Sequence, residues 1–360
     1  MKNISNVLVT GVGGIIGQGI IKCLRMANRS RSRSRSARYK YYIIGVDSSA
    51  LAAGLYFSDV GLVIPNANDH DYIDSLTKII NEYNVSALYI GTDQELDVVS
   101  NSTGKIEKRT GVKVLICSNE VINISRDKWK TFLFLKKKKL PYVQSSLPER
   151  ATDFIERFGF PVVVKPREGF GSVHFNIVRD RNQLDNAIKN IESQGWNAII
   201  QEYIGGNDNE YTTGVLSDIR NNKIISSISI KKYIKAGQTY KGIIDDFPEA
   251  RRVSEAVAKS LNARGSINIQ SKISNGSHKI FEINGRISAT CPMRAAAGVN
   301  EPDLLYRNVI LSEDLRITSH KKLLSMRYWN EVYVKKKIYE SVALTGLVPS
   351  GIESEVFSVR

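Results

Sequence analysis

The first 120 residues alternate between short apolar stretches and helical patterns, and this alternation constrains the fold more than any other feature. We expect strands over residues 6–9, 41–46, 60–64, 87–91 and 112–117, a glycine-rich turn and helix over 11–24, and a helix over 72–83. Strands separated by helical segments of about 10–15 residues are typical of βαβ units, whose strands form a parallel sheet covered on both faces. The sequence therefore predicts an α/β first domain.

Near residues 118–126 the pattern changes, and from residue 160 onward the expected strands form antiparallel pairs. Residues 161–165 pair with 173–178, residues 266–273 pair with 279–284, and a further strand over 224–230 lies nearby. Runs of strands with segregated helices are typical of an α+β domain. A chain of 360 residues is long enough for two or three such domains.

The composition is that of a soluble globular protein, with 42% hydrophobic and 24% charged residues. It excludes a collagen, coiled-coil or wholly disordered chain. No apolar run approaches the ~20 residues that cross a bilayer, and residues 1–6 do not resemble a signal peptide. Cys23, Cys117 and Cys291 are far apart, which favours a reducing cytoplasm over a disulfide framework or a zinc site.

The net charge of +15 is unevenly distributed, because residues 29–38 contain five arginines and no acid. Such a run cannot bury apolar surface, so we expect a solvated loop, although a loop of this kind can also contact an acidic partner. No aromatic residues interleave the basic runs, as binding to single-stranded nucleic acid would favour. We therefore expect neither nucleic acid nor a membrane as a partner.

A glycine-rich turn lies between the first strand and the first helix. Gly11, Gly14 and Gly17 permit close approach of a phosphate to a helix N-terminus, and Asp47 ends the next strand, where a ribose-binding acid would lie. These residues are compatible with a nicotinamide dinucleotide. They are equally compatible with helix–strand packing in a domain that binds no nucleotide, and the turn alone leaves both interpretations open.

Lys165 ends an apolar strand that continues into a glycine loop, Gly169-Phe-Gly-Ser172. This is not a Walker loop, which needs a GK[ST] ending that opens a helix. A hairpin of this kind can fold its backbone N–H groups over a polyphosphate while the lysine adds a point charge. The alternative is a plain hairpin with an incidental lysine.

Two later strands carry polar side chains with a period of two residues. Asn268 and Gln270 share one face of the first strand, and Glu282 and Asn284 share one face of the second, opposite to Phe281. A two-residue turn would place the two polar sets on opposite faces, whereas a three-residue loop over 274–276 would place them together, and we expect the latter. Three converging oxygen donors would then suit Mg²⁺ bound to substrate phosphates.

These features occur in the order found in ATP-grasp enzymes. The ordered set is Lys128, Lys165 with its glycine loop, Gln201–Ile204 with Glu210, Asn268–Gln270, and Glu282–Arg286. Over about residues 5–310 the chain resembles one synthetase unit of the carbamoyl-phosphate synthase large subunit and related carboxylate–amine ligases. The resemblance implies a Rossmann-like pre-ATP-grasp domain at 1–120, a two-lobed ATP-grasp domain at 121–320 with its lid at about 152–203, and a C-terminal extension at 321–360.

The resemblance also implies a role for each residue that matches a family motif. ATP would be bound by Lys128, Lys165, the lid residues Gly169, Gly171 and Ser172, the adenine-binding residues Glu202, Tyr203 and Ile204, and the ribose-binding Glu210. Mg²⁺, with Mn²⁺ as a substitute, would be bound by Gln270, Glu282 and Asn284, and Arg286 and Lys165 would be catalytic. The family's usual proline before the arginine is Gly285 in this chain, which adds backbone freedom next to Arg286.

For the substrate we select Arg294, because arginine binds carboxylates bidentately. Lys231, Lys232, Tyr240 and Lys241 lie in a suitable segment, but a solvated basic strand is the favoured interpretation for them. The implied activity is ATP-dependent activation of a small-molecule carboxylate as an acyl phosphate, followed by attack of an amine or a similar nucleophile. The alternatives are an NAD(P)-dependent oxidoreductase and a non-catalytic ATP-binding protein, and a homodimer is compatible with each.

Overall fold

The computed structural model describes residues 3–32, 39–169, 173–206, 209–349 and 355–356. Its first domain contains a parallel sheet of five strands in the order β3-β2-β1-β4-β5. The strands are β1 (Asn3–Val9), β2 (Tyr39–Asp47), β3 (Val60–Val63), β4 (Ala87–Tyr89) and β5 (Lys113–Val114). The helices are α1 (Ile15–Ser32), α2 (Tyr72–Glu82) and α3 (Leu96–Thr110). The α/β prediction is confirmed, although α3 was not predicted. Helix α1 extends to Ser32, so residues 29–32 of the expected arginine-rich loop are helical, and residues 33–38 lie outside the described residues.

The strand order of this sheet reverses at β1. The chain adds β2 and β3 on one side of β1 and then returns to place β4 and β5 on the other. The glycine turn follows β1 and residues 91–93 follow β4, so both lie at the carboxyl edge of the sheet beside this reversal. Ligands of open α/β sheets commonly bind at such a point.

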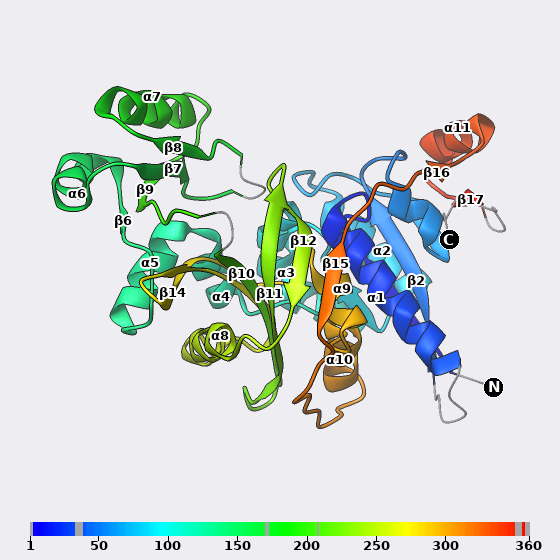
Figure 1. Cartoon of the computed structure of the whole chain (residues 1–360). Helices are drawn as coiled ribbons and strands as arrows, with labels where there is room; N and C mark the ends of the chain where they lie inside the picture. Colours follow the sequence, from blue (N-terminus) through cyan, green and yellow to red (C-terminus); the bar gives the residue numbers. More distant parts are fainter. Residues whose placement is uncertain (1–2, 33–38, 170–172, 207–208, 350–354, 357–360) are drawn as a thin grey trace.

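Two helices, α4 (Asn119–Arg126) and α5 (Lys128–Lys137), lead into a small antiparallel lobe. This lobe contains a sheet of four strands in the order β6-β9-β7-β8, and it projects away from the rest of the molecule in Figure 1. Its strands are β6 (Ser145–Ser146), β7 (Val162–Pro166), β8 (Asn176–Val178) and β9 (Ala198–Glu202). Helices α6 (Ala151–Phe158) and α7 (Arg181–Glu192) pack on this sheet and form a separate hydrophobic core with it.

The second lobe is an antiparallel sheet of six strands in the order β14-β13-β10-β11-β12-β15. Its strands are β10 (Glu210–Ser217), β11 (Ile224–Lys235), β12 (Gln238–Ile244), β13 (Gly265–Ser274), β14 (Ser277–Asn284) and β15 (Leu323–Met326). Helix α8 (Pro248–Ser260) packs against it, and α9 (Cys291–Ala296) and α10 (Glu301–Val309) follow β14. Because β15 pairs with β12, the region expected to be a C-terminal extension contributes a strand to this lobe.

The β13–β14 hairpin differs from the sequence prediction. Ser274 pairs with Ser277, so the turn has two residues, and Asn275 and Gly276 both have positive φ (50° and 73°). Asn-Gly is the pair that such a tight turn prefers, so the predicted three-residue loop is wrong. A β-bulge at residue 281 shifts the register instead, and Gln270 pairs with Glu282. The expected convergence of the two polar sets therefore arises from a bulge in the strand.

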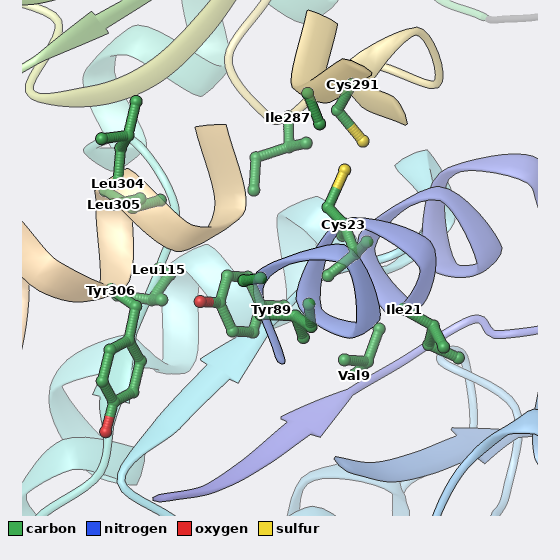
Figure 2. Packing of buried hydrophobic residues seen from close by; sticks show 14 of the residues in the cluster. Val9, Ile21, Cys23, Tyr89, Leu115, Ile287, Cys291, Leu304, Leu305 and Tyr306 are labelled. Atoms are coloured by element: carbon green, nitrogen blue, oxygen red, sulfur yellow. The ribbon is translucent and has the colours of Figure 1, made fainter. Parts of the chain in front are cut away.

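The first domain and the six-stranded lobe share one hydrophobic core. Helix α1 contacts both α9 and α10, and the buried side chains of β1, β4 and α1 form one cluster with those of residues 287–306. Figure 2 shows part of this cluster, where Cys23 of α1 and Cys291 of α9 face each other. This shared core fixes the carboxyl edge of the parallel sheet relative to the six-stranded sheet.

Residues near the C-terminus return to the first domain. Helix α11 (Lys336–Thr345) precedes a short stretch that pairs with β3, where Val63 N donates to Gly346 O at 2.7 Å and Val348 N donates to Gly61 O at 2.9 Å. Strand β16 (Val332–Tyr333) pairs with β17 (Glu355–Val356). Among the helices of the described ranges, none combines the length and the apolar character needed to cross a membrane.

Candidate active site

A cavity of about 680 Å³ lies between the two antiparallel sheets and the first domain. The first domain lines it with residues 14–16 at the start of α1 and residues 91–93 after β4. The four-stranded sheet lines it from β7 and β9, and the six-stranded sheet from β10, β11, β13 and β14. A cavity between lobes, at the carboxyl edge of a parallel sheet, is a common place for a ligand.

The structure brings most of the predicted site residues together around this cavity. Those that line it are Lys128, Lys165, Gly169, Glu202, Tyr203, Ile204, Glu210, Gln270, Glu282, Asn284 and Arg286. Gly171 and Ser172 fall outside the described residues, so their predicted lid contacts stay a prediction. Arg294 does not line the cavity.

Lys165 extends from β7 into the cavity with 8% of its surface exposed. Burial disfavours its ammonium form and Lys128 adds like-charge repulsion, while Glu282 and Glu210 act in the opposite direction. The balance lowers the pKa of Lys165 to about 7. A buried lysine whose charge is incompletely offset fits a site that receives an anion.

Lys128 begins α5 and connects this helix to the loop after β7. Its Nζ donates to the carbonyl oxygens of Arg167 at 3.3 Å and Gly169 at 3.1 Å, and burial lowers its pKa. The preceding Asp127 caps α5 and also binds the Arg167 guanidinium at 2.5 Å. The base of the glycine loop is thus tied to the start of α5, which keeps both lysines at the same end of the cavity.

Glu282 and Asn284 extend from β14 into the same end of the cavity. Burial alone would raise the pKa of Glu282, but the ammonium groups of Lys128, Lys165 and Lys232 hold it below its usual range. Asn284 Nδ2 donates to Glu282 Oε1 at 3.2 Å, and Asn284 Oδ1 accepts a long hydrogen bond from Arg286 Nη2 at 3.4 Å. The two side chains therefore offer an ionised carboxylate and an amide oxygen, the donors that hard divalent cations prefer.

Lys232 connects Gln270 to Glu210. This lysine lies in β11 with 6% of its surface exposed, and its Nζ donates to Gln270 Oε1 and forms an ion pair with Glu210 Oε1 at 2.7 Å. Lys272 Nζ lies 3.6 Å from the other oxygen of Glu210. The interpretation of Lys232 as part of a solvated strand is wrong, because this side chain is buried at the cavity wall.

The predicted adenine-binding segment ends β9 and enters the loop that follows. Both oxygens of Glu202 accept hydrogen bonds from Lys279 Nζ, at 2.8 and 3.0 Å, and Oε1 also accepts from Gln144 N at 2.9 Å. Tyr203 and Ile204 line the cavity beside it. Because the Glu202 carboxylate is already engaged, the backbone and the apolar side chains of this segment are the groups left to contact a base.

Arg286 is held by an acid of the first domain. Its Nε and Nη2 donate to the two carboxylate oxygens of Asp93, at 2.7 and 2.8 Å, and both residues line the cavity. Asp93 begins a single turn of 3₁₀ helix, η2 (Asp93–Glu95), which is separated from the end of β4 by residues 90–92. Gly285 packs against α4, where an added Cβ would lie 3.1 Å from Ser125 Oγ. The small residue before Arg286 therefore permits this close approach.

Arg294 does not occupy the position expected for a substrate clamp. Its side chain is fully buried and forms an ion pair with Glu301, Nη1 to Oε2 at 3.0 Å, while Nη2 donates to Asn268 Oδ1 at 2.7 Å. Because a protein carboxylate already neutralises this guanidinium in the interior, the structure favours a structural role for Arg294 in joining α9, α10 and β13.

Two cavity residues were missed by the sequence reasoning. Arg327 follows β15 and lines the cavity, its Nη2 donates to Ala289 O at 2.5 Å, and burial lowers its pKa. No acid of the described residues forms an ion pair with it. Asp93 had a usable signal, since it follows a strand of the parallel sheet at the edge where ligands bind. Arg327 had none, because the pairing of β15 with β12 brings it there from a distant part of the chain.

The glycine turn of the first domain serves packing. Added Cβ atoms would lie 2.4 Å from Gly11 O at Gly17 and 1.9 Å from Thr10 O at Gly91, so helix α1 and the end of β4 approach too closely for side chains. The Gly13 amide donates to Asp47 Oδ2 at 2.7 Å. A carboxylate thus lies against the turn where a pyrophosphate would need free N–H groups, which supports the packing interpretation over the nicotinamide one.

Two parts of the chain match known protein families. A family described as "ATP-grasp domain" matches residues 125–290, and one described as "PylC-like, N-terminal domain" matches residues 21–115. The relatives include the carbamoyl phosphate synthase large chains of Sulfolobus acidocaldarius, 23% identical over 87% of this chain, and of Thermoanaerobacter sp. (strain X514), 27% identical over 53% of it. These matches cover 30% and 19% of the relatives, so the chain spans less than a third of their length.

Solved structures share the fold. The biotin carboxylase domain of Hydrogenobacter thermophilus 2-oxoglutarate carboxylase superposes with a TM-score of 0.68 at 18% identity, over 88% of this chain and 71% of that one. N5-carboxyaminoimidazole synthetase of Staphylococcus aureus complexed with ADP also gives 0.68, at 17% identity, over 91% and 83%. L-amino acid ligase of Bacillus licheniformis gives 0.61 at 15% identity, over 86% and 74%. Residues 125–290 of the chain thus match an ATP-grasp domain, and the preceding residues 21–115 match a PylC-like N-terminal domain.

Proposed function

We propose that this chain is an ATP-dependent ligase that activates a carboxylate as an acyl phosphate and joins it to an amine or a similar nucleophile. The observation that carries the proposal is the arrangement of charge along the cavity. Lys128 and Lys165 line it beside Glu282, and Arg286 and Arg327 line it as well, with Arg286 bound to Asp93 of the first domain. Such a site offers several cationic side chains to a polyphosphate and to a carboxylate.

ATP would lie between the two antiparallel sheets. The apolar side chains of Val163, Ile177 and Ile204 line the part of the cavity nearest the small lobe and suit a base. The triphosphate would extend toward Lys128 and Lys165, which offset its charge. Two solved structures of similar fold contain ADP or MgADP, which supports the proposal that this chain binds ATP.

The residues present fit a magnesium ion that is shared with phosphate. Mg²⁺ usually takes one or two carboxylates and completes its coordination with water and substrate phosphates. Glu282 and Asn284 supply this kind of partial set, and within the described ranges no cluster of three His, Cys, Asp or Glu forms a complete one. When bound, the ion would neutralise phosphate charge and orient the terminal phosphoryl group.

The chemistry then has two steps. A carboxylate oxygen of the substrate attacks the γ-phosphorus while the bond to ADP breaks, which gives an acyl phosphate. The amine nitrogen attacks the acyl carbon, inorganic phosphate leaves, and the nitrogen loses a proton. Lys165 offsets the charge of the phosphoryl group in transfer, Arg286 and Arg327 bind the carboxylate, and Asp93 orients Arg286.

Trapping of the acyl phosphate tests the proposal directly. The full chain is incubated with Mg·ATP, a panel of small carboxylates and hydroxylamine, and ADP and hydroxamate are measured together. We expect equal amounts of both for the true substrate, and none in Glu282→Gln. ATP binding without ADP release for any carboxylate would support the non-catalytic alternative. A cytoplasmic location and a homodimer stay predictions.

A further inference from the structure

Gln270 was expected to bind a metal ion, but in the structure its side-chain oxygen already has a cationic partner. Lys232 Nζ of β11 reaches across β10 and donates to Gln270 Oε1 of β13. Gln270 can accept hydrogen bonds only through Oε1, since its amide nitrogen is a donor. A divalent ion that used the remaining lone pair of this oxygen would lie directly beside the ammonium group.

The charges around Lys232 oppose a divalent ion at this position. Glu210 forms an ion pair with Lys232 at 2.7 Å and also lies 3.6 Å from Lys272, so this carboxylate already faces two ammonium groups. Gln270 is neutral and offers no charge to offset an added cation. Like charges at close range repel strongly where the surroundings are shielded from water, and Lys232 has 6% of its surface exposed.

Glu282 is the carboxylate that remains for a metal ion. It lies directly opposite Gln270 in the β13–β14 pair and lines the cavity next to Asn284. The oxygen donors Glu282 and Asn284 therefore lie next to the ammonium group of Lys232, which is held by Gln270 and Glu210. The site provides one place for a divalent cation, with the Lys232 side chain beside it.

Building on the proposed function, we propose that this chain uses a single divalent cation with ATP, and that the Lys232 ammonium, held by Gln270 and Glu210, takes the place of a second. Lys232 then contacts the triphosphate directly. Gln270 acts as a positioning residue for this lysine.

Counting bound metal ions tests the inference without any turnover. The full chain is mixed with a non-hydrolysable ATP analogue and titrated with Mn²⁺, and the free ion is measured by electron paramagnetic resonance. We expect one Mn²⁺ per chain in the wild-type complex. The double variant K232M/Q270E removes the ammonium and adds a carboxylate, so it should bind two.

The same analogue measures the contribution of Lys232 without metal. In calorimetry without divalent ions, K232M should weaken analogue binding about tenfold to a hundredfold, as expected for losing a hydrogen bond to a charged group. K231M is the matched control, because Lys231 is the neighbouring lysine of β11 and does not line the cavity. It should leave both the affinity and the metal count unchanged.

The outcomes separate this inference from the proposed function. Two Mn²⁺ ions in the wild-type complex, or an unchanged affinity in K232M, would overturn the inference and leave the ligase proposal intact. Failure of the wild-type chain to bind the analogue at all would overturn both. The wild-type count needs no variant, so it decides the question even if K232M does not fold.

Discussion

Lys165 should take up a proton when the nucleotide binds. In the free protein its pKa is lowered to about 7, first by burial and then by the charge of Lys128. At pH 8 a group with this pKa is about one-tenth protonated. A triphosphate beside it favours the ammonium form and returns the pKa toward its ordinary value, so binding at pH 8 should be accompanied by uptake of about 0.9 proton.

The same reasoning fixes the pH dependence of affinity. Protonating Lys165 at pH 8 costs about 1.4 kcal/mol, since pH 8 lies one unit above the pKa in the free protein. Affinity should therefore fall about tenfold for each further pH unit until the pKa of the bound form is reached. The lowered pKa of Lys128 acts in the same direction.

Calorimetry in two buffers with different ionisation enthalpies measures the uptake. A non-hydrolysable analogue is used at pH 8, where its terminal phosphate, with a pKa of about 6, has already lost its proton. The variant K165R is the control, because a guanidinium stays protonated, so the part of the uptake that Lys165 contributes should be lost. Equal binding enthalpies in both buffers for the wild type would refute the argument, since they would mean that Lys165 is already charged in the free protein.

Three further predictions concern the groups that hold the site. Asp93→Asn loosens Arg286, so it should lower kcat about tenfold to a hundredfold while the affinity for the ATP analogue in calorimetry changes less than twofold. Arg294→Met leaves Glu301 buried without a partner and should lower the free energy of unfolding by about 3–5 kcal/mol in urea titration, whereas a substrate clamp would instead raise KM. Gly91→Ala places a Cβ 1.9 Å from the Thr10 carbonyl oxygen and should lower the unfolding free energy by more than 2 kcal/mol, as a strained overpacked site does; an unchanged urea midpoint would contradict the packing argument.

The α/β domain and both antiparallel lobes could be predicted from the sequence because their signals are local. Alternating strands and helices indicate a parallel sheet without information on the neighbouring domain, as the strands that end near Gly11 and at Asp47 illustrate. The ordered motifs from Lys128 to Arg286 then indicated which side chains would meet, and the structure places them around one cavity. The periodicity of hydrophobic residues and the order of motifs can both be read from the sequence without knowing any tertiary contact.

The parts that failed depend on contacts between distant segments. We expected the loop length to decide which side chains of β13 and β14 share a face, but a β-bulge at Phe281 decides it. The residue pattern of one strand does not show where a bulge will shift its pairing with the other strand. Arg294 has a suitable chemical character for a substrate clamp, and only the position of Glu301 shows that its charge is already satisfied. Burial of Lys232 likewise depends on neighbours from β10 and β13.

The pairing of residues 346–348 with β3 connects a late segment of the chain back to the first domain. The chain leaves the first domain after β5 to build the two lobes, and it returns where residues 346–348 pair with β3 at the edge of the parallel sheet. A proteolytic cut between β5 and α4 would therefore leave two fragments that stay associated through the pairing with β3 and through the shared hydrophobic core. Such a nicked protein should elute from a sizing column as one particle and fall apart only under denaturing conditions.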